Sequence, residues 1–217
     1  METGQNKVII VKENGEQILN PKKIEGLDLN IKGSNNIITI YEPYSFFASR
    51  IIATGDTEIT INRNCQAGAG FSIQKTRNVK PNKLVIGKDF QCGSRCTIDL
   101  TDAGDIFIGD DAKWSWNIYV KSDDTHPVFD ITTKECINES TAVTIGRHVW
   151  IGMNATILKN SEIKEESVVG ACSVVAKKFE EKNVVIAGNP AQIRKRNINW
   201  THGSVAGYIA KNKKEVK

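Results

Sequence analysis

The chain has 217 residues, of which 40% are hydrophobic and 25% are charged, and its formal net charge is +4. This length favours one domain of ~150 residues with appendages, and the small, dispersed positive charge predicts no nucleic-acid-binding surface. No apolar run approaches the ~18 residues of a membrane-spanning helix, so we expect no membrane span. The sequence opens without a signal-peptide pattern, and its five cysteines lack a paired CxxC spacing. We therefore expect a cytoplasmic protein with free thiols.

The first 36 residues carry no clear repeat, and we expect them to form a separate segment of irregular strands (residues 1–36). From residue 37 onward, hydrophobic residues return every six positions in broken sets, the first of them faint. The sets are Ile40, Phe46 and Ile52; Ile61, Ala67 and Ile73; Ile86, Cys92 and Ile98; and Ile108, Trp114 and Val120. The indole of Trp114 is wide for the interior of a narrow coil. We therefore expect either a bulge there or a slipped register that brings Trp114, Trp116 or Tyr119 near a cleft.

The repeat stops between Val120 and Ile145, which predicts that residues 121–144 are extruded from the coil as a loop. Loops of this kind often carry function, and this one contains His126. Pro127 restrains the histidine before it toward extended geometry, which suits a side chain held away from the body of the protein. His126 is therefore a candidate functional residue, and an inert surface histidine is the alternative interpretation.

From Ile145 the repeat is unbroken, and a smaller residue follows each aliphatic residue after four positions. The aliphatic positions are Ile145, Ile151, Ile157, Ile163, Val169 and Val175. Three hexads would complete one turn of a triangular coil, and stacked coils would pair their backbones as a parallel sheet. The sequence therefore predicts an all-β, parallel β-helix of hexapeptide repeats over residues 37–196. A doubly wound α/β domain or a β-sandwich is the alternative, in which a fixed hexad would be an accident.

The last segment (residues 197–217) leaves the repeat as a tail, with a short helix expected over residues 203–214. Within the coil, Trp150 lies between the inward Val149 and Ile151, so strand alternation points its side chain outward. An outward tryptophan favours either a functional site or packing against a neighbouring subunit, and both interpretations stay open.

Residues 143–196 resemble the C-terminal half of the hexapeptide-repeat acyltransferases, and the similarity extends over about residues 58–196. The sequence is similar in particular to the branch that includes the galactoside and maltose acetyltransferases and the capsular-polysaccharide and sialic-acid O-acetyltransferases. This resemblance implies a left-handed β-helix, acetyl-CoA as co-substrate, and a homotrimer with active sites between its subunits.

The Thr125-His126-Pro127 triplet matches the catalytic-histidine loop of that family, so the resemblance implies that His126 is the catalytic base. A neutral imidazole can take the proton of an acceptor hydroxyl and return it to the leaving thiolate. The same resemblance implies that Trp150 lies in the acceptor and thioester region and is catalytic together with His126. It also implies that backbone N–H groups near Trp150–Met153 donate hydrogen bonds to the oxyanion. The carboxylate that would orient the imidazole stays open among Asp123, Asp124 and Asp130.

Further site residues follow from the resemblance. The expected coenzyme-binding residues are Trp150, Gly152, Met153, Ala171, Ala176, Lys177, Lys178 and Arg194. Trp116 and Tyr119 are expected to contact the acceptor. Gly93 stands where galactoside-type relatives carry an acceptor-binding asparagine, which argues against a simple galactoside or maltose acceptor.

We therefore expect an acetyl-CoA-dependent O-acetyltransferase that transfers acetyl directly to a sugar hydroxyl of a capsular polysaccharide, a lipopolysaccharide or its precursor, with a sialic acid as one candidate acceptor. An N-acetyltransferase acting on an amino sugar and a non-catalytic β-helix scaffold are the alternatives. No metal is expected, because the zinc carbonic anhydrases of this fold need three histidine ligands, and of the three histidines here His202 lies beyond the coil.

Overall fold

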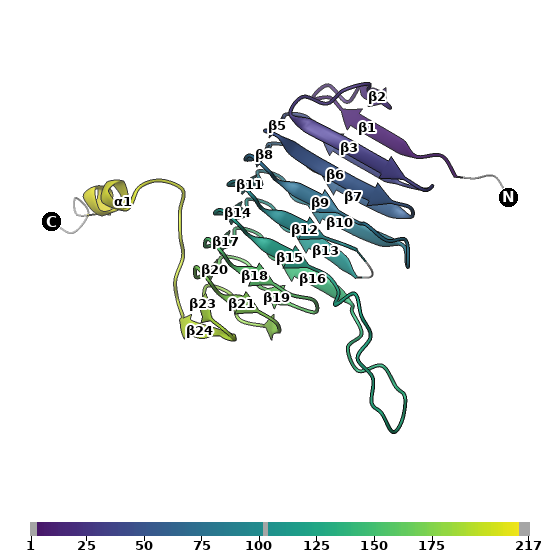
Figure 1. Cartoon of the computed structure of the whole chain (residues 1–217). Helices are drawn as coiled ribbons and strands as arrows, with labels where there is room; N and C mark the ends of the chain where they lie inside the picture. Colours follow the sequence, from purple (N-terminus) through teal and green to yellow (C-terminus); the bar gives the residue numbers. More distant parts are fainter. Residues whose placement is uncertain (1–3, 102–103, 213–217) are drawn as a thin grey trace.

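The computed structural model describes residues 4–101 and 104–212. Successive strands pass around three long sheets, and within a sheet a strand pairs with the strand one coil further along. Figure 1 shows the resulting stack of coils, with one extruded loop and a short helix near the C-terminal end. The predicted all-β parallel β-helix is confirmed, together with its extruded loop and short C-terminal helix.

Each sheet forms one face of the three-sided coil. Sheet A has nine strands, in the order β2 (Gln17–Leu19), β1 (Lys7–Val11), β4 (Ile37–Tyr41), β7 (Thr57–Ile61), β10 (Asn82–Ile86), β13 (Asp105–Ile108), β16 (Ala142–Ile145), β19 (Glu162–Ile163) and β22 (Lys178–Phe179). Sheet B has seven, β21 (Val174–Val175), β18 (Thr156–Ile157), β15 (Tyr119–Lys121), β12 (Thr97–Asp99), β9 (Ser72–Gln74), β6 (Ser49–Thr54) and β3 (Leu27–Lys32). Sheet C has eight, β24 (Ala191–Lys195), β23 (Val185–Gly188), β20 (Val168–Val169), β17 (Trp150–Ile151), β14 (Lys113–Trp114), β11 (Gln91–Cys92), β8 (Cys65–Ala67) and β5 (Tyr44–Phe46).

The chain runs from sheet A to sheet C to sheet B and back to sheet A, which defines an A–C edge, a C–B edge and a B–A edge. Among the named strands, only the β1/β2 and β23/β24 pairs are antiparallel. Within the first 36 residues, β1 and β3 pair in parallel with β4 and β6 of the following coil. The parallel sheets therefore extend into the segment that carries no clear repeat.

The six-residue repeat of the sequence sets the alignment of each strand with the strand of the next coil. Ile145 pairs with Ile163, Ile151 with Val169, and Ile157 with Val175, and all six side chains are buried. Burying an aliphatic side chain of this size stabilises the fold by about 1.5–3 kcal/mol. The core is thus a column of aliphatic layers, one layer for each coil.

The earlier sets follow the same register with one correction. Ile40 and Phe46 pair with Ile61 and Ala67 as expected, but the inward residue of the next strand is Ile51, and Ile52 faces outward. Only two residues separate β5 from β6. The corner at the C–B edge of this coil is therefore one residue shorter than the six-residue repeat predicts.

Trp114 keeps its register, and the predicted slip is wrong. It pairs with Cys92 below and Ile151 above, is 2% exposed, and packs edge-to-face on Phe90 with 5.0 Å between ring centroids. The small residues Cys92 and Ala67 occupy the same column in the two preceding coils, and this leaves room for the indole.

The corners of the coils have their own six-residue period. A Cβ on Gly146 or Gly152 would lie only 2.5–2.6 Å from a backbone nitrogen of the next coil, so the close stacking requires glycine there. Left-handed backbone angles recur at every sixth residue, in a run of His148, Asn154, Asn160, Glu166 and Cys172. Asparagine tolerates this conformation better than most residues.

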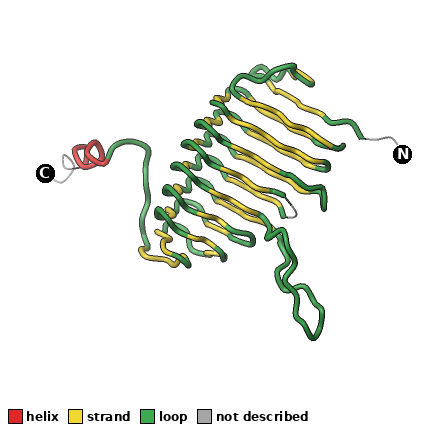
Figure 2. The backbone as a smooth tube through the Cα atoms, in the orientation of Figure 1, coloured by secondary structure: helices red, strands yellow, loops and turns green. Residues whose placement is uncertain are grey.

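Two segments leave the coil. Residues 122–141 connect β15 to β16 and project outward as a loop, shown in green in Figure 2. Helix α1 (Val205–Asn212) begins after Ser204, whose hydroxyl accepts the backbone N–H of Gly207 at 3.0 Å as a helix cap. The expected helix end at Lys214 lies outside the described residues. No helix in the part of the chain that the structure describes is long and apolar enough to cross a bilayer.

Candidate functional site

His126 lies where the extruded loop leaves the coil, at the B–A edge just beyond β15, and its side chain is exposed. Its backbone is held on both sides. The N–H donates to the carbonyl of Asp124 at 2.7 Å, and the carbonyl accepts the amide of Asn138 at 3.0 Å. The loop therefore presents an accessible imidazole on a fixed backbone.

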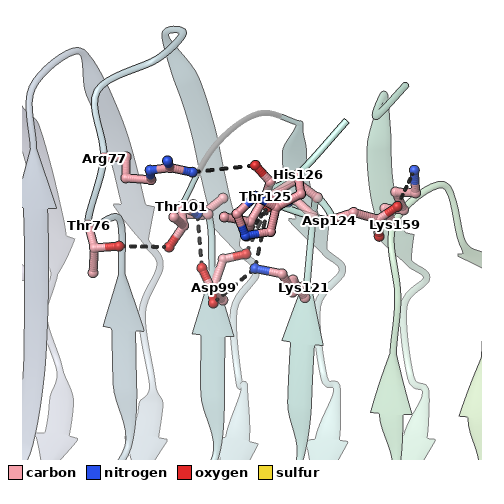
Figure 3. Close-up of polar contacts among 12 residues, drawn as sticks. Thr76, Arg77, Asp99, Thr101, Lys121, Asp124, Thr125, His126 and Lys159 are labelled. Atoms are coloured by element: carbon pink, nitrogen blue, oxygen red, sulfur yellow. Dashed lines mark hydrogen bonds and ion pairs between the residues drawn. The ribbon is translucent and has the colours of Figure 1, made fainter. Parts of the chain in front are cut away.

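The base of the loop is pinned to the neighbouring coil by Asp124 (Figure 3). Its carboxylate accepts the ammonium of Lys159 at 2.8 Å and the amide of Asn138 at 2.9 Å. The hydrogen bond from Lys159 lowers the pKa of Asp124 below its usual range, so the pair is charged at neutral pH. Further out, the loop closes as a short hairpin in which the N–H of Ile137 donates to the carbonyl of Val128 at 2.9 Å.

A second polar cluster lies below the loop on sheet B (Figure 3). The buried Asp99 accepts the hydroxyl of Tyr119 at 2.7 Å and the ammonium of Lys121 at 3.3 Å. Burial raises the pKa of Asp99, but the hydrogen bonds from Thr101 and Tyr119 and the charge of Lys121 outweigh burial, so the pKa is lowered overall. Burial and the neighbouring carboxylate raise the pKa of Tyr119. This cluster supports the coil directly beneath His126.

The three aspartates near His126 already have partners. Asp123 accepts the backbone N–H of Thr125 at 2.8 Å, Asp124 holds Lys159, and Asp130 accepts the backbone N–H groups of a turn within the hairpin. The structure therefore does not single out one of them as the carboxylate that orients the imidazole.

A pocket of about 860 Å³ opens on the outer face of sheet C, between the coil and the tail. All four tryptophans of the chain line it: Trp114, Trp116, Trp150 and Trp200. Trp116 and Trp150 are substantially exposed, and Lys113, His202 and Tyr208 complete the lining. The pocket offers apolar faces and a few polar groups, a combination common in ligand sites.

The tail forms one wall of this pocket because a network at the A–C edge holds it. The ring of Trp200 stacks on His148 at 4.0 Å between centroids and 10° between planes, and its indole N–H donates to the carbonyl of His148 at 2.8 Å. Asp111 lies between the two histidines, 2.6 Å from Nδ1 of His148 and 2.8 Å from Nε2 of His202.

Sequence reasoning missed this network, which joins residues more than 35 positions apart. The available signals were the tail motif Asn197-Ile198-Asn199-Trp200 and the position of His148 at the start of the left-handed corner run.

The predicted coenzyme-binding residues fall into separate groups. Gly152, Met153 and Ala171 lie together at the C–B edge, where the N–H of Cys172 donates to the carbonyl of Met153 at 2.9 Å. Ala176 and Lys177 lie at the B–A edge, the edge that carries His126, and Lys178 begins β22 on sheet A. Lys177 donates to Gln192 at 3.0 Å.

Arg194 stands in β24 and donates to the carbonyl of Ala187 at 3.0 Å. It belongs to the hairpin of β23 and β24, whose turn Gly188-Asn189-Pro190-Ala191 lies at the end of the coil.

The two predicted catalytic residues are not neighbours within one chain. His126 lies at the B–A edge, and Trp150 lies on sheet C, the face opposite that edge of the three-sided coil. Trp116 shares the pocket with Trp150, whereas Tyr119 lies on sheet B beneath the loop of His126. The predicted site residues therefore lie on two opposite sides of the coil.

Comparison with known proteins identifies the family. The profile of the bacterial transferase hexapeptide (six repeats) matches residues 142–177. The polysialic acid O-acetyltransferase of Neisseria meningitidis is 43% identical over 187 residues, which cover 78% of this chain and 87% of the relative. The chain belongs to the hexapeptide-repeat acyltransferase family. It is therefore an enzyme of the O-acetyltransferase class, as the sequence resemblance implies.

Two further matches describe the relationship of this hexapeptide-repeat acyltransferase to others. The crystal structure of the polySia-specific acetyltransferase NeuO superposes with a TM-score of 0.73 at 26% identity, covering 96% of this chain and 95% of that one. This match confirms that the β-helix is of the left-handed acetyltransferase type. The polysialic acid O-acetyltransferase of Escherichia coli O1:K1 / APEC is 31% identical over 135 residues, and the match covers 62% of this chain but only 43% of the relative's length.

Proposed function

We propose that this hexapeptide-repeat acyltransferase uses acetyl-CoA to acetylate a hydroxyl of a sialic-acid-type sugar in a surface polysaccharide or its precursor. The observation that carries the proposal is an accessible histidine on a pinned loop, together with a tryptophan-lined pocket on the opposite face of the same coil. The polysialic acid specificity of the relatives named above supports an acidic sugar as the acceptor class.

In the proposed reaction, a neutral His126 takes the proton of the acceptor hydroxyl while the oxygen attacks the thioester carbonyl. The tetrahedral intermediate then collapses, the C–S bond breaks, and the imidazolium returns its proton to the thiolate of coenzyme A. The acetyl group passes directly to the sugar, so no covalent acetyl-enzyme is formed.

The oxyanion of the intermediate needs hydrogen-bond donors that are not already used. The N–H groups of Trp150 and Gly152 donate to Ser167 and Val169 of the next coil at 3.0 and 2.8 Å. We propose the N–H of Met153, which follows β17 at the C–B edge, as the donor within the stretch Trp150–Met153.

We propose that a complete site needs two copies of the chain, arranged in a homotrimer. His126 of one copy would meet the Trp150 pocket of the next, because the two residues lie on opposite sides of a single coil. A heterologous contact of this kind closes into a ring when the rotation between copies is suitable, and a homotrimer, as the family resemblance implies, is such a ring.

The grouping of the coenzyme residues follows the same division. Gly152, Met153 and Ala171 would contact the pantetheine arm from the copy that contributes Trp150, since their edge presents backbone and small side chains. Lys177 and Lys178, at or next to the edge of His126, would supply positive charge for the phosphates, and Arg194 would add to it from the side of sheet C.

Release of free thiol from acetyl-CoA tests the proposal across matched acceptors: sialic acid, oligosialic acid, neutral sugars and amino sugars. We expect thiol release above the acceptor-free rate with the sialic acids. Release with amino sugars alone would instead identify an N-acetyltransferase, and no release with the sialic acids would overturn the proposed acceptor class.

A further inference from the structure

The network that holds the tail contains three side chains with metal-binding atoms. One ligand atom from each of Asp111, His148 and His202 lies within 4.8 Å of the other two. The carboxylate of Asp111 faces Nδ1 of His148 and Nε2 of His202. Ligands of a tetrahedral zinc ion lie about 3.4 Å apart, so these atoms are within roughly 1–1.5 Å of a coordinating arrangement. They come from three separate segments, namely two coils and the tail.

The orientation of His148 matches that of a metal ligand. Its Nε2 lies 3.0 Å from the backbone carbonyl of Trp200, which can only accept a hydrogen bond, so Nε2 carries a proton. Metal-ligating histidines commonly donate their second ring N–H to such a carbonyl, which fixes the tautomer and the ring plane. The stacked ring of Trp200 restrains the imidazole further.

The remaining nitrogen of His148 also faces an acceptor, since Asp111 lies 2.6 Å from Nδ1. His202 meets the same carboxylate through Nε2, so two imidazoles and one carboxylate come together at this place.

We propose that Asp111, His148 and His202 bind one divalent transition-metal ion of the Zn²⁺ class. Two imidazoles and one carboxylate form a ligand set that zinc accepts, and the fourth position is left for water or an anionic group. The ion would fasten the tail to the coil and so shape the wall of the tryptophan-lined pocket, to which His202 also belongs.

The charged side chains around the three ligands change the expected affinity for a metal ion in opposite directions. Glu166 lies 3.8 Å from Nε2 of His148 and favours a cation, although it also pairs with Arg147. The ammonium of Lys113 lies 3.3 Å from Nδ1 of His202, and its positive charge disfavours a cation at the site. Lys113 also donates to Gln91 at 3.3 Å, so its ammonium can retain that contact while Nδ1 of His202 becomes the protonated nitrogen.

Metal analysis of the full chain tests this site with Zn²⁺ as the probe. After removal of metal by a chelator and saturation with Zn²⁺ at pH 7.5, the wild-type chain is expected to retain about one Zn²⁺ through gel filtration. Asp111→Asn and His202→Ala are expected to weaken Zn²⁺ affinity by at least about 100-fold, since losing a direct ligand exceeds the ~10–100-fold effect of an outer partner.

Two controls separate a metal site from a hydrogen-bonded network. His126→Ala removes the third histidine and should leave Zn²⁺ retention unchanged, whereas Lys113→Met removes a repelling charge and should increase Zn²⁺ affinity. Substitution with Co²⁺ should give the visible absorption of a four-coordinate ion in the wild type and lose it in His202→Ala.

Either of two results would overturn the proposal: a folded wild-type chain that retains no Zn²⁺, or equal retention by the wild type and His202→Ala. His202 lies in the exposed tail outside the coil, so His202→Ala is expected to keep the far-ultraviolet circular dichroism of the wild type. Because the readout is metal content, it is independent of the proposed acetyl transfer.

Discussion

His126 combines an exposed ring with a backbone that its neighbours hold at both the N–H and the carbonyl. The ring contributes nothing to the buried core, so a substitution of His126 can abolish activity without destabilising the coil. A substitution of a core residue should destabilise the coil instead, so single substitutions can separate the two effects.

The first prediction concerns catalysis. His126→Ala should lower kcat by about 10²–10⁴, the range of a lost general base, while the melting temperature stays that of the wild type. Thiol release at saturating acetyl-CoA and acceptor measures kcat. A folded variant with turnover within about threefold of the wild type would remove His126 from the proposed role.

The second prediction compares two isoleucines. Ile157 is fully buried in the coil, whereas Ile131 at the tip of the loop is 79% exposed. Ile157→Ala should lower the free energy of unfolding by about 2–5 kcal/mol, and Ile131→Ala should change it by less than about 0.5 kcal/mol. Urea unfolding at one fixed chain concentration measures both, and equal effects would contradict the assigned register.

At the scale of elements, the extruded loop depends on a few polar contacts at its base, because its own side chains bury little surface. Asp124, Lys159 and Asn138 join the loop to the coil, and the hairpin contact between Val128 and Ile137 lies beyond them. The loop should therefore open locally while the coil stays folded.

The third prediction is the pH dependence of this local opening. The pKa of Asp124 is lower in the folded chain than the ~3.9 of an unfolded aspartate, so the pair stabilises the closed loop at pH values above the unfolded pKa. This stabilisation is lost as the pH falls through the folded-state pKa. Since both partners are partly exposed, the change should stay below about 1 kcal/mol.

Hydrogen-exchange protection of the Ile137 amide, compared across pH 2–5, measures the opening. Lys159→Met should lower protection at pH 5 and move the remaining acid loss closer to the ordinary aspartate pKa. Lys88→Met, a substitution of an exposed lysine at a different edge, serves as the matched control. Identical protection in all three proteins would show that the Asp124–Lys159 pair does not hold the loop.

At the scale of the whole molecule, the three-sided coil sets His126 and Trp150 apart. An edge and the face opposite to it cannot meet within one rigid prism, so a site that uses both residues must be shared between copies. The same geometry would divide the proposed coenzyme contacts between two copies.

The fourth prediction tests this sharing. Trp150→Ala and His126→Ala should each be nearly inactive, but chains of the two variants assembled together should regain activity. Random assembly of equal amounts into cyclic trimers leaves about one quarter of the sites with both residues intact. Thiol release after unfolding and refolding the mixture measures the gain, and no gain above the separate variants would place both residues in one chain's site.

The hexad alone was sufficient to predict the coils, the buried positions and the place of the extruded loop. Inward residues recur at a constant local spacing, so register could be read without any long-range information, and even Trp114 obeys it. The exception is Ile52, which faces outward because one corner is a residue shorter than the repeat. The family and its O-acetyltransferase class also followed from the sequence, whereas the division of the chain at residue 36 stays a prediction.

Tertiary structure alone decided how the tail folds back and which sides of the coil carry the predicted site residues. Asp111, His148 and His202 are far apart in sequence, and no period links them, so only the stacking of coils and the path of the tail bring them together. The separation of His126 from Trp150 likewise depends on which edge and which face the hexads reach. Local spacing specifies each turn of the coil, but contacts between turns and tail exist only once the three-dimensional path is complete.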